Sequence, residues 1–328
     1  MNEIELRNYV AQSGFSPDAT ITLLGKGEAH ENYLYRDQKR RLVIRTIRND
    51  RPQQSSFRNE FEMLSFVNAQ GIEFAPQTEL YDEDREIHII SFVEGQDTSI
   101  AELPMEFLPL FVKQLVHLEA LSYETYRVFA TTKKLPVREP ESTTTQLQKF
   151  CDTWYQNIRN HAGDPYIDYV LKWLDSKFDY IKTASHEWPE QIRFVHGDLR
   201  WHPGGGNLRV SDTKLSFIDW EGACFLSSNR LEIADVVASI PKPEEENTDR
   251  VSTLIKLYAQ ITQQEVQSLT EQLLYSIRFS KFTDVLWCTD RMLQLKASGS
   301  ETWHDYKTMN DYRLDAGNYY FLIDTLPT

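Results

Sequence analysis

Three polar side chains near the middle of the chain have the chemistry that phosphoryl transfer requires. Asp198 follows an apolar run at 194–195, Asn207 follows a glycine-rich loop, and Asp219 follows a second apolar run at 215–218. Phosphoryl transfer from a nucleotide needs a carboxylate that accepts the proton of the attacking hydroxyl, and oxygen atoms that hold Mg²⁺ on the phosphates. Two carboxylates and an amide in this order meet both needs. The sequence has no paired Cys or His pattern for zinc, which also favours a hard cation with oxygen ligands.

The order of these residues resembles that of a known family. The segments His196-Gly197-Asp198, Asn207 and Ile218-Asp219-Trp220 are similar to the motifs of the aminoglycoside phosphotransferase/choline kinase-like family, small-molecule kinases with the protein-kinase fold. The resemblance implies that Asp198 is the catalytic base, that Asn207 and Asp219 bind Mg²⁺, and that His196 supports the loop. Downstream, 232–235 resembles the helix start of the family, where an Asp, here Asp235, braces the catalytic loop.

The loop between Asp198 and Asn207 departs from the family pattern, which is D-x-x-x-x-N. Eight residues, 199–206, lie between them, and three of these are glycines. One interpretation is a tight bulge that the glycines permit and that keeps the Mg²⁺ geometry. The other is a loop rebuilt for a particular acceptor, with Arg200 or Trp201 in its pocket. Glu221 is a further candidate for acceptor contact.

The N-terminal part contains residues that suit the nucleotide side of such a site. The segment with Gly25, Gly27 and Asn32 resembles the loop that covers the nucleotide, although an ordinary hairpin turn has the same pattern. Arg45 lies where the family has a Lys, or in some members an Arg, that pairs with the α- and β-phosphates. Glu60 lies at the edge of the apolar face of the next helix. The resemblance implies that Glu60 forms an ion pair with Arg45. A solvent-exposed helix Glu is the alternative.

Hydrophobic periodicity divides the chain into a small strand-rich part and a larger helical part. It predicts strands at 21–24, 32–35, 42–44, 79–81 and 87–93, and a helix between 56 and 71. After Pro104 the period is helical, except between 194 and 218 and at a break at 241–247. We therefore expect an α+β, two-lobed protein-kinase-like fold. Residues 1–95 would form a nucleotide-binding lobe with a small antiparallel sheet and one main helix, and 96–328 a mainly helical catalytic and acceptor-binding lobe.

The connection between these lobes has its own expected role. The residues Ser91, Phe92 and Val93 resemble the family's connecting segment, whose backbone groups would hold the adenine.

Composition limits the partners. The 35 basic and 49 acidic residues give a net charge of −14, which argues against binding to nucleic acid or to an anionic membrane. Three widely spaced cysteines, no signal-peptide pattern and no apolar run of about 18 residues favour unpaired thiols and a cytoplasmic protein. The acidity is spread over both expected lobes, so charge alone does not select a cationic acceptor.

We therefore expect an ATP- and Mg²⁺-dependent kinase that phosphorylates a hydroxyl group of a small molecule, such as an aminoglycoside, an amino alcohol or a sugar-like metabolite. The alternative is a catalytically weak or inactive kinase-like nucleotide-binding regulator, because the loop after Asp198 is long. A protein kinase is disfavoured, since Trp220-Glu221 replaces Phe-Gly and no Ala-Pro-Glu segment follows. No general code in the sequence identifies the acceptor or a protein partner. Trp154 and Trp173 have helical spacing and are expected in the core.

Overall fold

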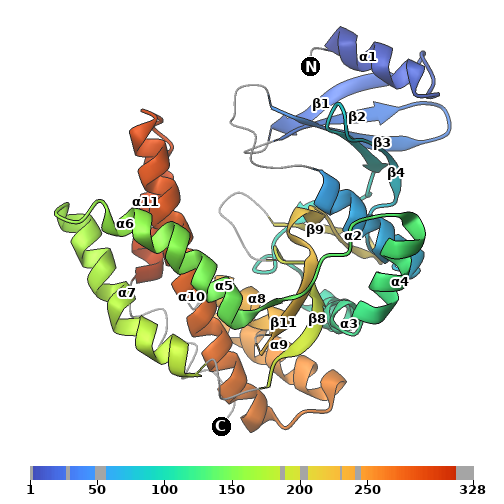
Figure 1. Cartoon of the computed structure of the whole chain (residues 1–328). Coiled ribbons are helices and arrows are strands. Elements are labelled where there is room, and N and C mark those ends of the chain that lie inside the picture. Colours follow the sequence, from blue (N-terminus) through green and yellow to red (C-terminus); the bar gives the residue numbers. More distant parts are fainter. Residues whose placement is uncertain are drawn as a thin grey trace.

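The computed structural model describes residues 3–26, 30–48, 57–184, 189–199, 206–229, 231–240 and 245–314. Its N-terminal part is a five-stranded antiparallel sheet with the strand order β1-β2-β3-β5-β4. These strands are β1 (Thr20–Lys26), β2 (His30–Arg36), β3 (Arg41–Ile47), β4 (Thr78–Asp82) and β5 (Ile87–Ser91), accompanied by helices α1 (Glu3–Gln12) and α2 (Arg58–Ala69). Figure 1 shows the sheet and α1 together at one end of the molecule.

The alternation of side chains along β3 explains how the sheet faces two different environments. Leu42 and Ile44 belong to a buried cluster that also contains Leu6 of α1. Successive strand residues point to opposite faces, so Val43 and Arg45 face away from α1. Val43 accordingly packs against the main core. The same face therefore directs Arg45 towards the rest of the molecule.

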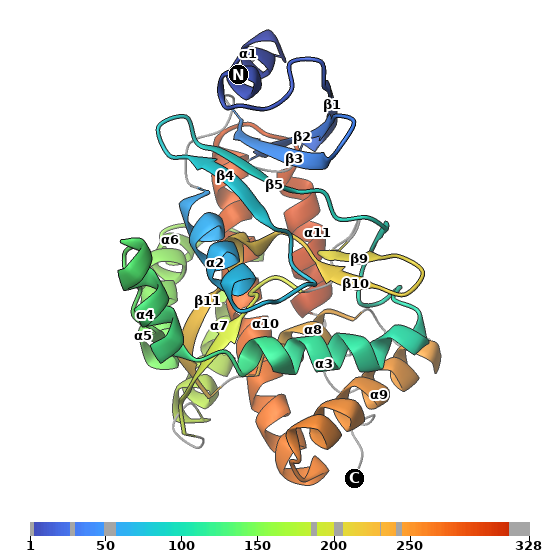
Figure 2. The ribbon, with the colours of Figure 1, turned by 90° about the vertical axis from the view of Figure 1, so that its right-hand side faces the viewer.

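The segment after the sheet passes close to a second, smaller sheet. Strand β6 (Gln96–Thr98) pairs with β9 (Leu208–Val210), which pairs with β10 (Leu215–Phe217). Gly95 has a φ of 124°, and a Cβ there would lie 2.5 Å from the carbonyl oxygen of Val210. Only glycine fits this close approach. Figure 2 shows the hairpin of β9 and β10 beside the segment that follows β5.

The remainder is mainly helical, with one further small sheet. That sheet has the order β7-β11-β8, from β7 (Glu141–Ser142), β11 (Cys224–Ser228) and β8 (Gln191–Val195). The helices between β6 and β8 are η1 (Met105–Phe107), α3 (Leu108–Glu119), α4 (Tyr123–Lys133), α5 (Thr143–Phe150), the π-helical η2 (Cys151–Tyr155), α6 (Gln156–Arg159) and α7 (Pro165–Ala184). Those after it are η3 (Trp220–Gly222), α8 (Glu232–Ser239), α9 (Glu245–Thr262), α10 (Val266–Ala297) and α11 (Trp303–Leu314).

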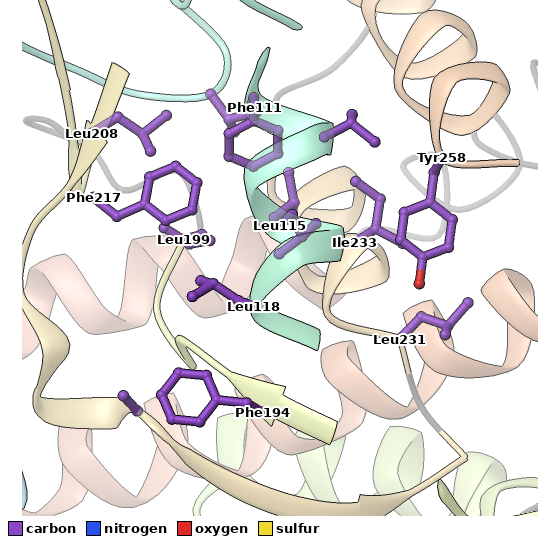
Figure 3. Packing of buried hydrophobic residues seen from close by; sticks show 14 of the residues in the cluster. Phe111, Leu115, Leu118, Phe194, Leu199, Leu208, Phe217, Leu231, Ile233 and Tyr258 are labelled. Carbon is purple, nitrogen blue, oxygen red and sulfur yellow. The ribbon is translucent and has the colours of Figure 1, made fainter. Parts of the chain in front are cut away.

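The main hydrophobic core anchors the strands that lead to the candidate site. Phe111, Leu115 and Leu118 recur at helical spacing on α3 and are fully buried. In Figure 3 they lie beside Leu208 of β9 and Phe217 of β10. The same cluster contains residues of α2, α8 and α9, so it joins the sheet end of the molecule to the helical end. A separate buried cluster joins α7 to α10.

The expected class of fold is confirmed, with several elements that the pattern did not predict. The five strands and the helix α2 lie where periodicity predicts them, within a few residues at their ends. Helix α1 and the short strands β6, β7 and β11 are additions. All three cysteines, Cys151, Cys224 and Cys288, are free, as expected. Among the described residues, no helix is both long and apolar enough to cross a membrane.

Candidate functional site

The segment 196–199, here called the catalytic loop, begins at the end of β8. His196 is fully buried, and its Nδ1 accepts a hydrogen bond from the Asp198 backbone N–H at 3.4 Å. Burial lowers the pKa of His196 to about 4, so its imidazole is neutral at pH 7. Gly197 has a φ of 84°, and a Cβ there would lie 2.5 Å from the carbonyl oxygen of Gly222. The loop is thus packed directly against η3, the turn that follows Asp219.

Asp198 and Asn207 are brought together despite the long loop between them. The Asn207 side-chain N–H group donates to the Asp198 backbone oxygen at 2.8 Å and to its Oδ2 at 2.9 Å. The Asn207 backbone oxygen accepts from Ile218 N at 2.9 Å, which ties it to the residue before Asp219. Because both amide hydrogens point to Asp198, the amide oxygen Oδ1 is the atom left to face a cation. Arg200 and Trp201 lie outside the described residues.

Asp219 occupies a strained backbone position between β10 and η3. Its φ is 62° and its ψ is 70°, the left-handed region that non-glycine residues rarely adopt. Its Oδ1 accepts from Arg45 Nη2 at 3.1 Å. Burial raises the pKa of Asp219, and the Arg45 charge opposes that rise. In this backbone conformation, one carboxylate oxygen of Asp219 contacts Arg45, and Oδ2 is left for another partner.

Arg45 and Glu60 form the expected ion pair, which is buried on both sides. Arg45 Nη1 donates to Glu60 Oε1, and the Glu60 side chain has no exposed surface. His88 of β5 contacts the other oxygen, with its Nδ1 3.1 Å from Oε2. Burial alone would raise the pKa of Glu60, but the charge of Arg45 and the contact with His88 lower it to about 2. The alternative of a solvent-exposed Glu60 is therefore wrong.

The oxygen atoms at this site suit Mg²⁺. Asn207 Oδ1 and Asp219 Oδ2 are the oxygen atoms that the hydrogen bonds above leave available as metal ligands. Mg²⁺ usually keeps several waters and binds through one or two carboxylates together with the phosphates of a substrate. Among the described residues, no group of three or more His, Cys, Asp or Glu side chains is arranged to hold a metal ion. Two protein ligands with room for phosphate oxygens are therefore the arrangement to expect.

A first cavity of about 270 Å³ lies between the N-terminal sheet and β9. We call it the nucleotide cavity. Its lining residues include the following sequence-predicted ones: Gly25, Asn32, Arg45, Ser91, Phe92, Val93, Asn207 and Asp219. Gly27 lies outside the described residues. Arg45, which is expected to bind phosphates, and the segment expected to bind the base therefore border the same space.

A second cavity of about 290 Å³ lies on the other side of the catalytic loop, against α5, α8 and α10. We call it the acceptor cavity. It is bordered by Gly197 and Gly222 and by a set of acidic and aromatic side chains: Glu232, Asp235, Asp284, Phe150, Trp154 and Trp287. The Phe150 and Trp154 rings stack with their centroids 4.6 Å apart and an interplanar angle of 5°. Trp154 thus borders a cavity as well as packing against the core, and the π-helical turn η2 carries it there.

Glu221 does not border the acceptor cavity. Its side chain is 49% exposed, and its Oε2 lies 3.5 Å from His30 Nδ1. Burial of part of the group and the nearby Asp219 charge raise the pKa of Glu221 to about 7. The structure therefore places it beside the nucleotide-side strand β2, away from the position expected for acceptor contact.

Glu232 holds the catalytic loop, and sequence reasoning missed it. Its two carboxylate oxygens accept from His196 N at 3.1 Å and from Gly197 N at 2.7 Å. Burial raises the pKa of Glu232 to about 8, although these hydrogen bonds oppose the rise. The resemblance implies that Asp235 supports the loop, because the family has an Asp at this helix start. Glu232 is the first residue of α8, whose N-terminus faces the loop, whereas Asp235 is almost one turn further and borders the acceptor cavity.

Comparison with known proteins identifies the family of the chain. A family model described as the phosphotransferase enzyme family matches residues 20–226. A comparison with curated proteins found no significant match.

Solved structures share the fold over the whole chain. A choline kinase from Cryptosporidium parvum Iowa II is 17% identical, with a TM-score of 0.64 over 99% of this chain and 98% of that one. A choline/ethanolamine kinase family protein from Mesorhizobium loti is 14% identical, with a TM-score of 0.67 over 99% of both chains. A spectinomycin phosphotransferase in complex with ADP and spectinomycin is 10% identical, with a TM-score of 0.61 over 99% and 98%. The expected kinase-like fold is confirmed, and the chain belongs to the phosphotransferase enzyme family.

Proposed function

We propose that this protein transfers the γ-phosphoryl group of Mg·ATP to a hydroxyl group of a cationic small molecule. The carrying observation is that Asp198 lies next to residues of both cavities. Its neighbour Gly197 borders the acceptor cavity, and its hydrogen-bond partner Asn207 borders the nucleotide cavity. A carboxylate between a nucleotide and an alcohol is placed to accept the alcohol's proton as the oxygen attacks phosphorus.

Each part of the chemistry would have its own residues in this proposal. Residues 1–95 would bind the nucleotide, with Arg45 on the phosphates and Glu60 orienting Arg45. Asn207 Oδ1 and Asp219 Oδ2 would hold Mg²⁺, which offsets the negative charge of the phosphates when it is bound. Residues 96–328 would bind the acceptor and position its hydroxyl next to Asp198. Catalysis would then rest on positioning and charge compensation.

The residues that line the acceptor cavity favour a cationic acceptor. Asp235 and Asp284 add formal negative charge, and Phe150, Trp154 and Trp287 add aromatic surface. An ammonium group is attracted both by carboxylates and by aromatic faces. Arg193 also borders the cavity, at the end nearest β8 and β11. We therefore expect amino alcohols and aminoglycosides to be better acceptors than neutral sugars. As the composition suggests, we expect the protein to act in the cytoplasm.

The test is a Mg·ATP consumption screen with product analysis by mass spectrometry. Amino alcohols, aminoglycosides and neutral sugars of similar size serve as acceptors. Phosphorylation of a cationic acceptor that Asp198→Ala abolishes would support the proposal. Asp212→Ala is the matched control, because Asp212 is an exposed aspartate in the turn between β9 and β10 and its loss should leave turnover unchanged. Equal turnover by wild type and Asp198→Ala with every acceptor would favour the alternative of an inactive nucleotide-binding protein.

A further inference from the structure

Arg209 borders the nucleotide cavity at the end away from Arg45. It lies in the middle of β9, where its neighbour Leu208 is buried in the main core. Strand alternation turns the Arg209 side chain to the opposite face, and there it lines the cavity with Phe92, Val93 and Asp97. The side chain is 19% exposed. A guanidinium group thus forms part of the wall where the base of a nucleotide is expected.

The position of the guanidinium is set by three contacts. Arg209 Nε donates to Asp97 Oδ1 at 2.7 Å, and Nη1 donates to the backbone oxygen of Val93 at 2.7 Å. The central guanidinium carbon also lies 5.1 Å from the centroid of the Phe92 ring. These contacts hold the planar group against the segment that joins the two parts of the molecule, so its rotamer is defined before a nucleotide binds.

The guanidinium supplies this wall of the cavity with hydrogen-bond donors. A guanidinium has five N–H donors and no acceptor, and the two oxygens above use two of the five. The Val93 carbonyl already receives one hydrogen bond from Arg209, which leaves it one lone pair. The three N–H donors of Arg209 that these two bonds leave favour a base that presents acceptors to the guanidinium.

Guanine presents such acceptors, whereas adenine presents an amino group beside N7. The guanine atoms O6 and N7 form the pair that arginine contacts most often in specific recognition of bases. We propose that Arg209 is a base-specificity residue that admits guanine, so that GTP binds at this site as well as ATP does. This inference rests on the proposed function, because it concerns the phosphoryl donor of the same site.

Arg41 provides a matched control for Arg209. Its guanidinium carbon lies 4.0 Å from the centroid of the same Phe92 ring, and it pairs with Glu94. It does not border the nucleotide cavity. Arg41→Leu therefore removes an arginine from the same aromatic ring and the same linker without removing a donor from the cavity wall.

The experiment measures binding of AMP-PNP and GMP-PNP in Mg²⁺ by isothermal titration calorimetry, so no acceptor is needed. For the wild type we expect the two Kd values to lie within about threefold of one another. Arg209→Leu should weaken GMP-PNP binding by about tenfold while AMP-PNP binding changes by less than about threefold, since a lost bidentate contact affects one base only. Arg41→Leu should leave the ratio of the two Kd values unchanged. Arg209→Lys, which keeps the charge but loses the planar fork, should shift the ratio in the same direction as Arg209→Leu.

Each outcome bears on the inference. The inference is overturned if the wild type binds AMP-PNP but not GMP-PNP. It is also overturned if both Arg209 variants weaken the binding of the two nucleotides equally, which is the result that a purely structural role would give. Those results would leave the proposed function intact. Failure of the wild type to bind either nucleotide would overturn the proposed function and this inference together.

Discussion

Glu60→Gln tests whether the buried contacts of Arg45 organise the nucleotide side of the site. In the wild type, Glu60 Oε1 accepts from Arg45, and Oε2 lies 3.1 Å from His88 Nδ1. Neither Glu60 nor His88 has exposed side-chain surface, and Arg45 has only 7%. Glutamine keeps the shape of the side chain but removes its charge, so the guanidinium keeps only Asp219 as a carboxylate partner within hydrogen-bonding distance among the described residues.

The expected loss of stability is large for a single substitution. Removing one partner of a buried ion pair costs about 3–5 kcal/mol, because the remaining charge stays buried without compensation. Since Asp219 still faces Arg45, we expect the lower end, about 3 kcal/mol, in urea unfolding at pH 7. Glu124→Gln is the control, since its pair with Arg127 is exposed and should contribute less than about 1 kcal/mol.

The pH dependence gives a second, independent measurement. The pKa of Glu60 is lowered from its ordinary 4.5 to about 2 in the folded protein. A carboxyl with a lowered folded-state pKa contributes stability that is complete above about pH 4.5 and is lost as pH falls towards about 2. The difference in unfolding free energy between wild type and Glu60→Gln should therefore be largest near neutral pH and shrink below about pH 4.5. A constant difference across this range, or a loss below about 1 kcal/mol at pH 7, would refute the reasoning.

Three further substitutions test other parts of the site. Asn207→Ala should reduce the gain in nucleotide affinity on adding Mg²⁺ by about tenfold, as measured by calorimetry with and without Mg²⁺. An unchanged gain would show that Asn207 is not a Mg²⁺ ligand. Glu232→Ala should lower the unfolding free energy by about 2 kcal/mol, because one buried and one partly buried backbone N–H group lose their acceptor, and a change below about 0.5 kcal/mol would contradict that account. Gly197→Ala should cost more than about 2 kcal/mol, because its positive φ and the carbonyl of Gly222 both oppose a Cβ. Gly163→Ala, with a φ of 103° and nothing within 4 Å of the new Cβ, should cost only about 1 kcal/mol, so equal losses would show that the close contact is unimportant.

The predicted residues that the structure brings together depend on local patterns. Asp198 and Asp219 follow apolar runs that become β8 and β10, and strand ends of this kind are visible in the sequence. Glu60 lies one position before an apolar residue of a periodic helix, so an ion pair with Arg45 could be predicted. The structure places all of these residues around the nucleotide cavity or directly beside it.

The residues that sequence reasoning missed depend on contacts between distant segments. Glu232 reaches the amides of the catalytic loop from 35 and 36 residues downstream, and His88 reaches Glu60 from 28 residues away. Neither separation has a period that a strand or a helix imposes. The helical spacing of Trp154 predicts a core position, and Trp154 does pack against a core cluster, but a π-helical turn, which periodicity does not reveal, also brings it to the edge of the acceptor cavity. Such positions follow from how the elements pack, and the pattern along one element does not contain that information.

The turn η3 explains how the two cavities can act as one site. It begins directly after Asp219, which borders the nucleotide cavity, and ends at Gly222, which borders the acceptor cavity. Helix α2 holds this turn: the Asn59 side-chain N–H group donates to the backbone oxygens of Glu221 at 2.7 Å and Ala223 at 3.1 Å. Glu60, the next residue of α2, is also the partner of Arg45. A displacement of α2 would therefore move Arg45, Asp219 and Gly222 together, so we expect that nucleotide binding that orders α2 also orders the part of the acceptor cavity beside the catalytic loop.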